Sequence, residues 1–286
     1  MNINYVIQFI SESFLGFYPI LIKLTTLSVE LNTFIRLVTY FLISSLFANW
    51  SIVSAIGLTK ILSLSIVNII HILTSYYAHQ NLNTSLGAPL FYTYPFINLI
   101  LGILYLNEQI SLSKFIFLGP ILFSIYNLYS SNKEDSVHKQ NIYKGIPLMI
   151  ISAFTESLLY ILIKTTELGN NPWNSLFITH ALAAFLFGFY YLYKNNINEI
   201  KDNLHNGRKR EFIYIILANV IIGFFGYSLR FYSIPRVEST IFSVISYTGI
   251  LATIFYSAIF KLDTITIEKI GWIITLILSL IGMKLI

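Results

Sequence analysis

Six ionisable side chains interrupt the long apolar stretches of this sequence: Glu12, Arg36, His71, Glu156, His180 and Arg230. An ionised group at the centre of a bilayer costs about 3 kcal/mol, so it normally faces a cavity or a charged partner. A carboxyl in apolar surroundings is suited to proton exchange. We therefore expect Glu12 or Glu156 to take up a proton, and Arg36 and Arg230 to bind or balance anionic groups.

Each of these groups also has a purely structural interpretation. Every one of them could pair with a neighbouring helix and serve packing only. Arg36 and Arg230 lie near the predicted ends of their apolar stretches, so each could instead extend its charge to the membrane surface. His71 also fits a hydrogen-bonded structural histidine.

Aromatic residues and prolines add further candidates. Tyr92 and Tyr94 are two residues apart, so in one continuous helix at most one of them would face a site, and Tyr94 is the candidate. Pro19 and Pro95 lie in or near apolar stretches, where a proline removes a backbone hydrogen bond and kinks the helix. Both are therefore candidate hinges or packing positions.

The composition indicates an integral membrane protein. The 286 residues are 56% hydrophobic and only 11% charged, with a mean hydropathy of +0.71. Soluble domains of this size are far less apolar and carry more charge. A bilayer core about 30 Å thick requires roughly 20 apolar residues per helix, so a series of such helices would use most of the chain.

The hydrophobic pattern predicts ten transmembrane helices, five before and five after a polar segment near the middle. Their approximate ranges are 4–25, 31–50, 57–79, 86–106 and 112–130, then 143–166, 173–193, 212–233, 238–260 and 265–286. The short links within each half make successive helices antiparallel neighbours. The expected fold class is therefore an all-α integral membrane protein.

An odd number of helices in each half predicts an inverted repeat. Five crossings reverse the direction of the chain, so the second half enters the membrane from the opposite side. The sequence around Pro19 to Lys23 resembles that from Tyr160 to Lys164. We expect a first repeat over residues 1–131, a polar linker over 132–142 and a second repeat over 143–286. Glu12 and Glu156 then lie on equivalent helices.

Several classes of function lack their sequence signals. The chain has no cysteine, which excludes disulfides and thiolate metal sites. It contains no HExxH zinc pair, no GxSxG elbow and neither of the glycine-rich phosphate loops. The net charge of +5 is carried mainly by loops, where it fits a topology signal. We expect no enzyme activity, cofactor, metal or nucleic-acid partner.

Loosely spaced motifs give the chain a family resemblance. Arg36, Tyr94-Pro95, Asn107-Glu108, Gly119 and the segment from Pro19 to Lys23 resemble the EamA-type drug/metabolite transporter superfamily. The resemblance covers essentially the whole chain and implies ten helices in two inverted repeats around a central cavity. The second copy departs from the pattern, because it has no proline near Tyr247.

The resemblance implies a secondary transporter of an amino acid, an amine or a similar small solute. Alternating access, with proton coupling as an option, is the expected mechanism. A nucleotide-sugar or organic-phosphate exchanger and a non-transporting scaffold or receptor are the alternatives. The expected partners are a small-molecule substrate and the lipid bilayer, and a homodimer is also compatible with the sequence. A multi-pass protein of the plasma or inner membrane is expected.

Overall fold

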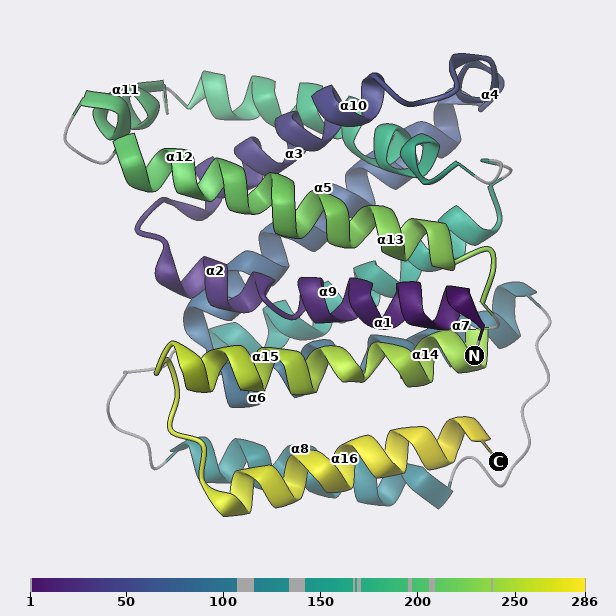
Figure 1. The fold of residues 1–286 in the computed structure, drawn as a ribbon, viewed down its shortest axis with the longest axis vertical. Helices are drawn as coiled ribbons and strands as arrows, with labels where there is room; N and C mark the ends of the chain where they lie inside the picture. Colours follow the sequence, from purple (N-terminus) through teal and green to yellow (C-terminus); the bar gives the residue numbers. More distant parts are fainter. Residues whose placement is uncertain are drawn as a thin grey trace.

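The computed structural model describes residues 2–106, 116–133, 142–166, 168, 171–194, 197–205, 209–237 and 239–285. All regular secondary structure in these residues is helical. The main helices lie side by side, with their axes running across the long dimension of the molecule (Figure 1). Residues 134–141 of the predicted linker and the Asn107-Glu108 motif lie outside the described residues.

The first half of the chain forms eight helices in its described residues. They are α1 (Ile3–Leu15), α2 (Tyr18–Leu24), α3 (Val29–Ser45), α4 (Trp50–Ser54), α5 (Leu58–Asn81), α6 (Thr84–Phe91), α7 (Tyr94–Leu106) and α8 (Leu118–Lys133). The second half forms α9 (Ile142–Lys164), α10 (Pro172–Tyr193), α11 (Ile197–His205), α12 (Lys209–Ala218), the π-helical segment η2 (Asn219–Phe224), α13 (Phe225–Ser233), α14 (Ser239–Ser246), α15 (Thr248–Ile259) and α16 (Ile267–Leu285).

Six helical stretches in the described residues are long and apolar enough to span a bilayer. They are Ile3–Leu24, Leu58–Asn81, Thr84–Tyr105, Ile142–Lys164, Pro172–Tyr193 and Phe212–Ser233. Large apolar side chains cover the outside of the molecule, including Phe189, which is 72% exposed, and Leu104, which is 67% exposed. Such a surface fits contact with lipid. The ten spans predicted from the sequence exceed the six that length and composition support directly.

Three of the predicted helices are broken, and a proline accounts for the break in two of them. A proline cannot donate to the carbonyl four residues earlier, and its ring clashes with that carbonyl. Pro19 lies four residues after Leu15, where α1 ends, and Pro95 lies four residues after Phe91, where α6 ends. The corresponding helix of the second half also breaks, between α14 and α15 at Tyr247, although it has no proline there.

The most extensive helix contacts join the two halves of the sequence. Helix α5 packs on α9, α10 on α3, α1 on α13 and α16 on α8, so each pair takes one helix from either half. Figure 1 shows the N-terminal helix α1 lying between α13 and α14 of the second half. The two halves therefore interdigitate, and their shared interface forms the centre of the molecule.

Candidate functional site

Four of the predicted ionisable groups meet in the centre of the bundle. Glu12 comes from α1, His71 from α5, Glu156 from α9 and Arg230 from α13. None of them is more than 5% exposed. The helices that carry them are the two cross-half pairs α1/α13 and α5/α9, so the packing of these pairs brings the side chains together.

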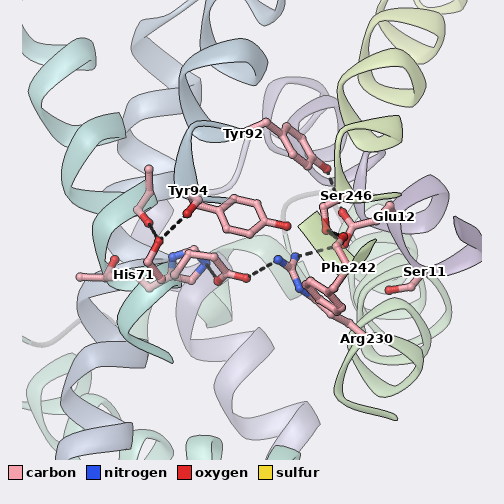
Figure 2. A network of polar contacts seen from close by, with 12 residues as sticks. Ser11, Glu12, His71, Tyr92, Tyr94, Arg230, Phe242 and Ser246 are labelled. Carbon is pink, nitrogen blue, oxygen red and sulfur yellow. Dashed lines mark hydrogen bonds and ion pairs between the residues drawn. The ribbon is translucent and has the colours of Figure 1, made fainter. Parts of the chain in front are cut away.

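These four side chains form one linear series of contacts, here called the central ion-pair chain. The Arg230 guanidinium lies 2.9 Å from Glu156 Oε1 and 3.8 Å from Glu12 Oε1. The other carboxylate oxygen of Glu156 lies 3.2 Å from His71 Nε2. Figure 2 shows Arg230 reaching toward Glu12 on one side, with His71 at the other end of the network. Removing Arg230 would leave the buried Glu12 carboxylate without an ion-pair partner among the described residues.

Neutral donors hold the Glu12 carboxylate in place. Gln8, one helical turn earlier, donates to Oε1 at 2.7 Å, and the Ser246 hydroxyl donates to the same oxygen at 3.2 Å. The Tyr92 hydroxyl donates to Oε2 at 3.4 Å. Since Tyr92 and Ser246 lie at the helix breaks of the two halves, movement at either break would change the environment of Glu12.

The contact between His71 and Glu156 can take up one proton. His71 Nδ1 lies 3.2 Å from the Ser152 carbonyl oxygen and 3.4 Å from the Ser152 hydroxyl. A neutral ring with its hydrogen on Nε2 donates to the Glu156 carboxylate and accepts at Nδ1 from the hydroxyl. A ring protonated on both nitrogens would instead donate from Nδ1 to the carbonyl oxygen. The pair is therefore arranged to hold and release a proton.

Tyr92 and Tyr94 both face the centre. The Arg230 guanidinium carbon lies 4.9 Å from the centroid of the Tyr94 ring, within cation–π range. The centroids of the Tyr92 and Tyr94 rings are 5.9 Å apart. The expectation that only one of these tyrosines would face a site is wrong, because the break between α6 and α7 falls between them.

Arg36 forms a second centre beside the ion-pair chain. Its side chain is buried, so the alternative that it extends to the membrane surface is wrong, as it is for Arg230. Its guanidinium carbon lies within 6 Å of the ring centroids of four tyrosines. The distances are 4.5 Å to Tyr227, 5.0 Å to Tyr18, 5.5 Å to Tyr40 and 5.9 Å to Tyr76. These four residues are called the tyrosine cage.

The π-helical segment positions part of the tyrosine cage. The Tyr18 hydroxyl lies 2.6 Å from the Tyr40 hydroxyl and donates to Asn219 Oδ1 at 2.7 Å. Asn219 begins η2, and Gly223 in the same segment leaves the space that both tyrosine hydroxyls occupy. Single π-helical turns occur often at functional sites. Asn219 and Gly223 lie four residues apart in this segment, and both face the cage.

His180 lies beside the tyrosine cage and outside the central ion-pair chain. Its ring centroid is 5.0 Å from that of Tyr40, and its Nδ1 lies 2.9 Å from the Leu176 carbonyl. Its other nitrogen, Nε2, is buried without a hydrogen-bond partner among the described residues. Among all the residues that the structure describes, no group of three His, Asp or Glu side chains could hold a metal ion.

Two small cavities flank this polar centre. The first, of about 30 Å³, includes Ile22, Ser75 and His79 in its lining, and these residues lie toward the end of the bundle that carries α11. The second, of about 10 Å³, includes Asn68 in the middle of α5 and Ile163 in the last turn of α9. The side chains that line both cavities are Arg36, His71, Tyr227 and Arg230. Each cavity has space for only one or two water molecules.

Hydrogen bonds between the halves close the bundle at both ends. At the α11 end, the Ser28 hydroxyl donates to Glu199 at 2.8 Å, and the backbone N–H of Ser85 donates to Asp263 at 2.8 Å. At the terminus end, the backbone N–H of Asn49 donates to the Asn174 side chain at 2.7 Å. The contacts of Ser28 with Glu199 and of Ser85 with Asp263 are called the α11-end latch. The contact of Asn49 with Asn174 is called the terminus-end latch.

Sequence reasoning missed most of the neutral residues of the site. Gln8, Ser246 and Asn219 are ordinary polar residues in apolar helices, and their positions carry no distinguishing pattern. The tyrosine cage was missed because the chain has 20 tyrosines, and nothing in the sequence separates these four from the rest.

Comparison with known proteins identifies the family. The model of the EamA-like transporter family matches residues 3–130 and 143–286, which correspond to the two repeats. No curated protein matches the sequence. One solved crystal structure has the same fold, with a TM-score of 0.64 at 10% identity, covering 100% of this chain and 99% of the other. The chain belongs to the EamA-like transporter family and is thus a multi-pass membrane transporter of the drug/metabolite transporter superfamily.

Proposed function

We propose that this protein is a proton-coupled secondary transporter that moves a small metabolite across the plasma or inner membrane by alternating access. Ten crossings in two inverted five-helix repeats would form its transport path. The observation that carries the proposal is the central ion-pair chain, in which two carboxylates and a histidine are buried together beside two cavities. Buried ionisable groups of this kind are typical of proton relays in transporters.

The pattern of ion pairs supports an inverted repeat. Glu12, on the first span of one half, pairs with Arg230 on the third span of the other. Glu156, on the first span of the second half, pairs with His71 on the third span of the first. A twofold axis would exchange these two pairs, as it would exchange the packed helices α1/α13 and α5/α9. It would also map the pairs α3/α10 and α8/α16 onto themselves.

The two cavities and the two latches support alternating access. Opening the α11-end latch would connect the larger cavity to one side of the membrane, and opening the terminus-end latch would connect the smaller cavity to the other. Both cavities reach Arg36, His71, Tyr227 and Arg230, so the same site would serve both directions. Because the halves interdigitate, we propose that the moving units are cross-half helix pairs.

The alternative of a non-transporting scaffold predicts a different pairing of Glu12, Glu156 and Arg36. A non-transporting protein should have all of its buried charges paired. Glu12 and Glu156 are paired, but Arg36 forms no ion pair within the described residues. This observation favours the transporter.

A flux assay tests the proposal. Purified protein in liposomes should take up a member of a panel of labelled amino acids, amines and carboxylates when a pH gradient is imposed. Glu156→Gln should abolish the dependence on the gradient, while Glu268→Gln, on the exposed side of α16, should leave uptake unchanged. Absence of flux for the whole panel, from protein that keeps its fold, would contradict the proposal.

A further inference from the structure

Arg36 is a buried cation that lacks an anionic partner in the described part of the chain. It is 2% exposed, and its Nε has no hydrogen-bond partner there. Burying an unpaired charge is costly, and the four tyrosine rings supply only part of the compensation, at about 0.5–2 kcal/mol for each close cation–π contact. Arg230, the other central arginine, already contacts two carboxylates. The two arginines therefore have different roles.

We propose that Arg36 binds a carboxylate group of the transported substrate inside the tyrosine cage, and that each carboxylate is bound together with one proton taken up by the central ion-pair chain. The proposal rests on the proposed transport function and specifies its substrate class. It narrows that class to small carboxylates, either monocarboxylic acids or amino acids.

The position of Arg36 allows this binding from either side of the membrane. Arg36 lines both cavities, and so does Tyr227 of the cage. The four ring centroids of the cage lie 4.5 to 5.9 Å from the guanidinium carbon. A carboxylate would accept from Arg36 Nε, which has no hydrogen-bond partner among the described residues. His180 Nε2, which has no partner among the described residues, lies in the lining of the smaller cavity beside Arg36. It provides a second polar atom for the same ligand.

The charges of the centre explain why a proton should accompany the anion. Two ionised glutamates and two arginines sum to zero when His71 is neutral. One proton on Glu12, Glu156 or His71 leaves a surplus positive charge, and Arg36 is the cation with no ion-pair partner in the described residues. The other polar groups that line the two cavities or contact Glu12 and Arg230 are the hydroxyls and amides of Gln8, Asn68, Ser75, Tyr92, Tyr94, Tyr160, Thr179, Ser246 and the tyrosine cage, together with His79 and His180. A bound carboxylate restores neutrality.

The same arithmetic selects a carboxylate over a phosphate. A phosphate dianion would require two surplus positive charges, but Arg230 is already matched by Glu12 and Glu156. Aliphatic side chains border the polar centre, Leu15 and Ile22 in one cavity and Leu159 and Ile163 in the other. The chemistry of this lining matches a ligand with a short apolar body and one carboxylate, and opening of a latch would have to enlarge the cavity that admits it.

A binding experiment separates this proposal from transport itself. Full-length protein in detergent is titrated calorimetrically with leucine, 4-methylpentanoate, 3-methylbutylamine and inorganic phosphate. Two buffers of different ionisation enthalpy give the number of protons taken up. We expect at least one of the two carboxylates to bind with uptake of one proton, and the amine and phosphate to bind at least about tenfold more weakly.

Variants assign the binding to Arg36. Arg36→Gln should weaken carboxylate binding by at least about tenfold, and Arg36→Lys should recover part of it, because the charge is kept but the bidentate geometry is lost. Arg236→Gln is the matched control, since Arg236 also stacks on a tyrosine but lines neither cavity. Thermal unfolding of each variant confirms that it is folded. If Arg36→Gln alone does not fold, the comparison of Arg36→Lys with wild type decides.

Three results would contradict the proposed binding site. It is overturned if neither carboxylate binds, if the amine or phosphate binds more tightly, or if the Arg36 variants bind as wild type does. Carboxylate binding without proton uptake would contradict the proposal that each carboxylate is bound together with one proton. Carboxylate binding at Arg36 without flux in liposomes would instead contradict the transport function and leave the binding site intact.

Discussion

Glu12 and Glu156 lie on different halves of the chain and contact the same guanidinium, that of Arg230, at 3.8 and 2.9 Å. Neither carboxylate can leave Arg230 without a buried charge losing its partner, which typically costs about 3–5 kcal/mol. A proton or a charged substrate can remove that cost. In the proposed mechanism, movement of α1 against α13, or of α5 against α9, would thereby depend on the ligands bound at the centre.

Replacing Glu156 tests this linkage. Glu156→Gln keeps the size and polarity of the side chain but removes the charge that contacts both Arg230 and His71. We expect uptake driven by a pH gradient to fall by at least about tenfold, because an amide cannot exchange the proton. Exchange of labelled for unlabelled substrate without a gradient should fall less. Equal loss in both assays would indicate a structural role only.

The packing of Gly223 gives a stability prediction. A Cβ at this position would collide with the hydroxyls of Tyr40 and Tyr18. Gly223→Ala should therefore lower the free energy of unfolding by about 1–3 kcal/mol, as overpacking of a buried site does. Gly271→Ala in α16 is the control, because nothing lies within 4 Å of its added Cβ. Thermal melting in detergent should show a lower Tm for the first variant and an unchanged or higher Tm for the second.

The latches predict opposite effects at the two ends of the bundle. Glu199→Gln weakens the contact with Ser28, so the α11 end should open more often. The chain has no cysteine, so Ser75→Cys, in the lining of the α11-end cavity, would be its single thiol. Its labelling by a small maleimide should become severalfold faster in the Glu199→Gln background, since weaker latch contacts favour the open state.

Asn174→Ala is the matched variant at the other end. It removes the contact with Asn49, so it should favour opening at the terminus end and slow the labelling of Cys at position 75. Faster labelling in both variants would indicate general loosening of the fold and would contradict two separate latches.

The sequence singled out the charged residues that the structure brings together, but it did not single out the neutral residues around them. Glu12, His71, Glu156 and Arg230 stand out because an ionisable group in an apolar helix needs a partner. Their approach to one another depends on how α1, α5, α9 and α13 pack, which no local pattern encodes. The all-helical fold was equally readable, because its signal is the repeated apolar stretch.

The helix breaks show where local reasoning failed. In a continuous helix the side chains of Tyr92 and Tyr94 would point in different directions. Both face the centre because the chain breaks between α6 and α7, and the sequence analysis did not include that break. The sequence analysis gives Pro95 as a candidate hinge. It does not predict that a break next to Pro95 would turn both Tyr92 and Tyr94 toward the centre. The break at Tyr247 has no proline, so it had no sequence signal of that kind.

Pro19 provides a test of whether these breaks matter for movement. Pro19→Ala would supply the missing N–H to the Leu15 carbonyl and allow α1 and α2 to form one helix, which should raise the free energy of unfolding by about 0.5–1.5 kcal/mol. The same change should slow uptake, because Glu12 and Tyr18 lie on either side of the break. Pro147→Ala is the control, since α9 continues unbroken through Pro147 and uptake should not change. A Pro19→Ala variant that melts at a higher temperature yet transports at the wild-type rate would show that the break is not a hinge.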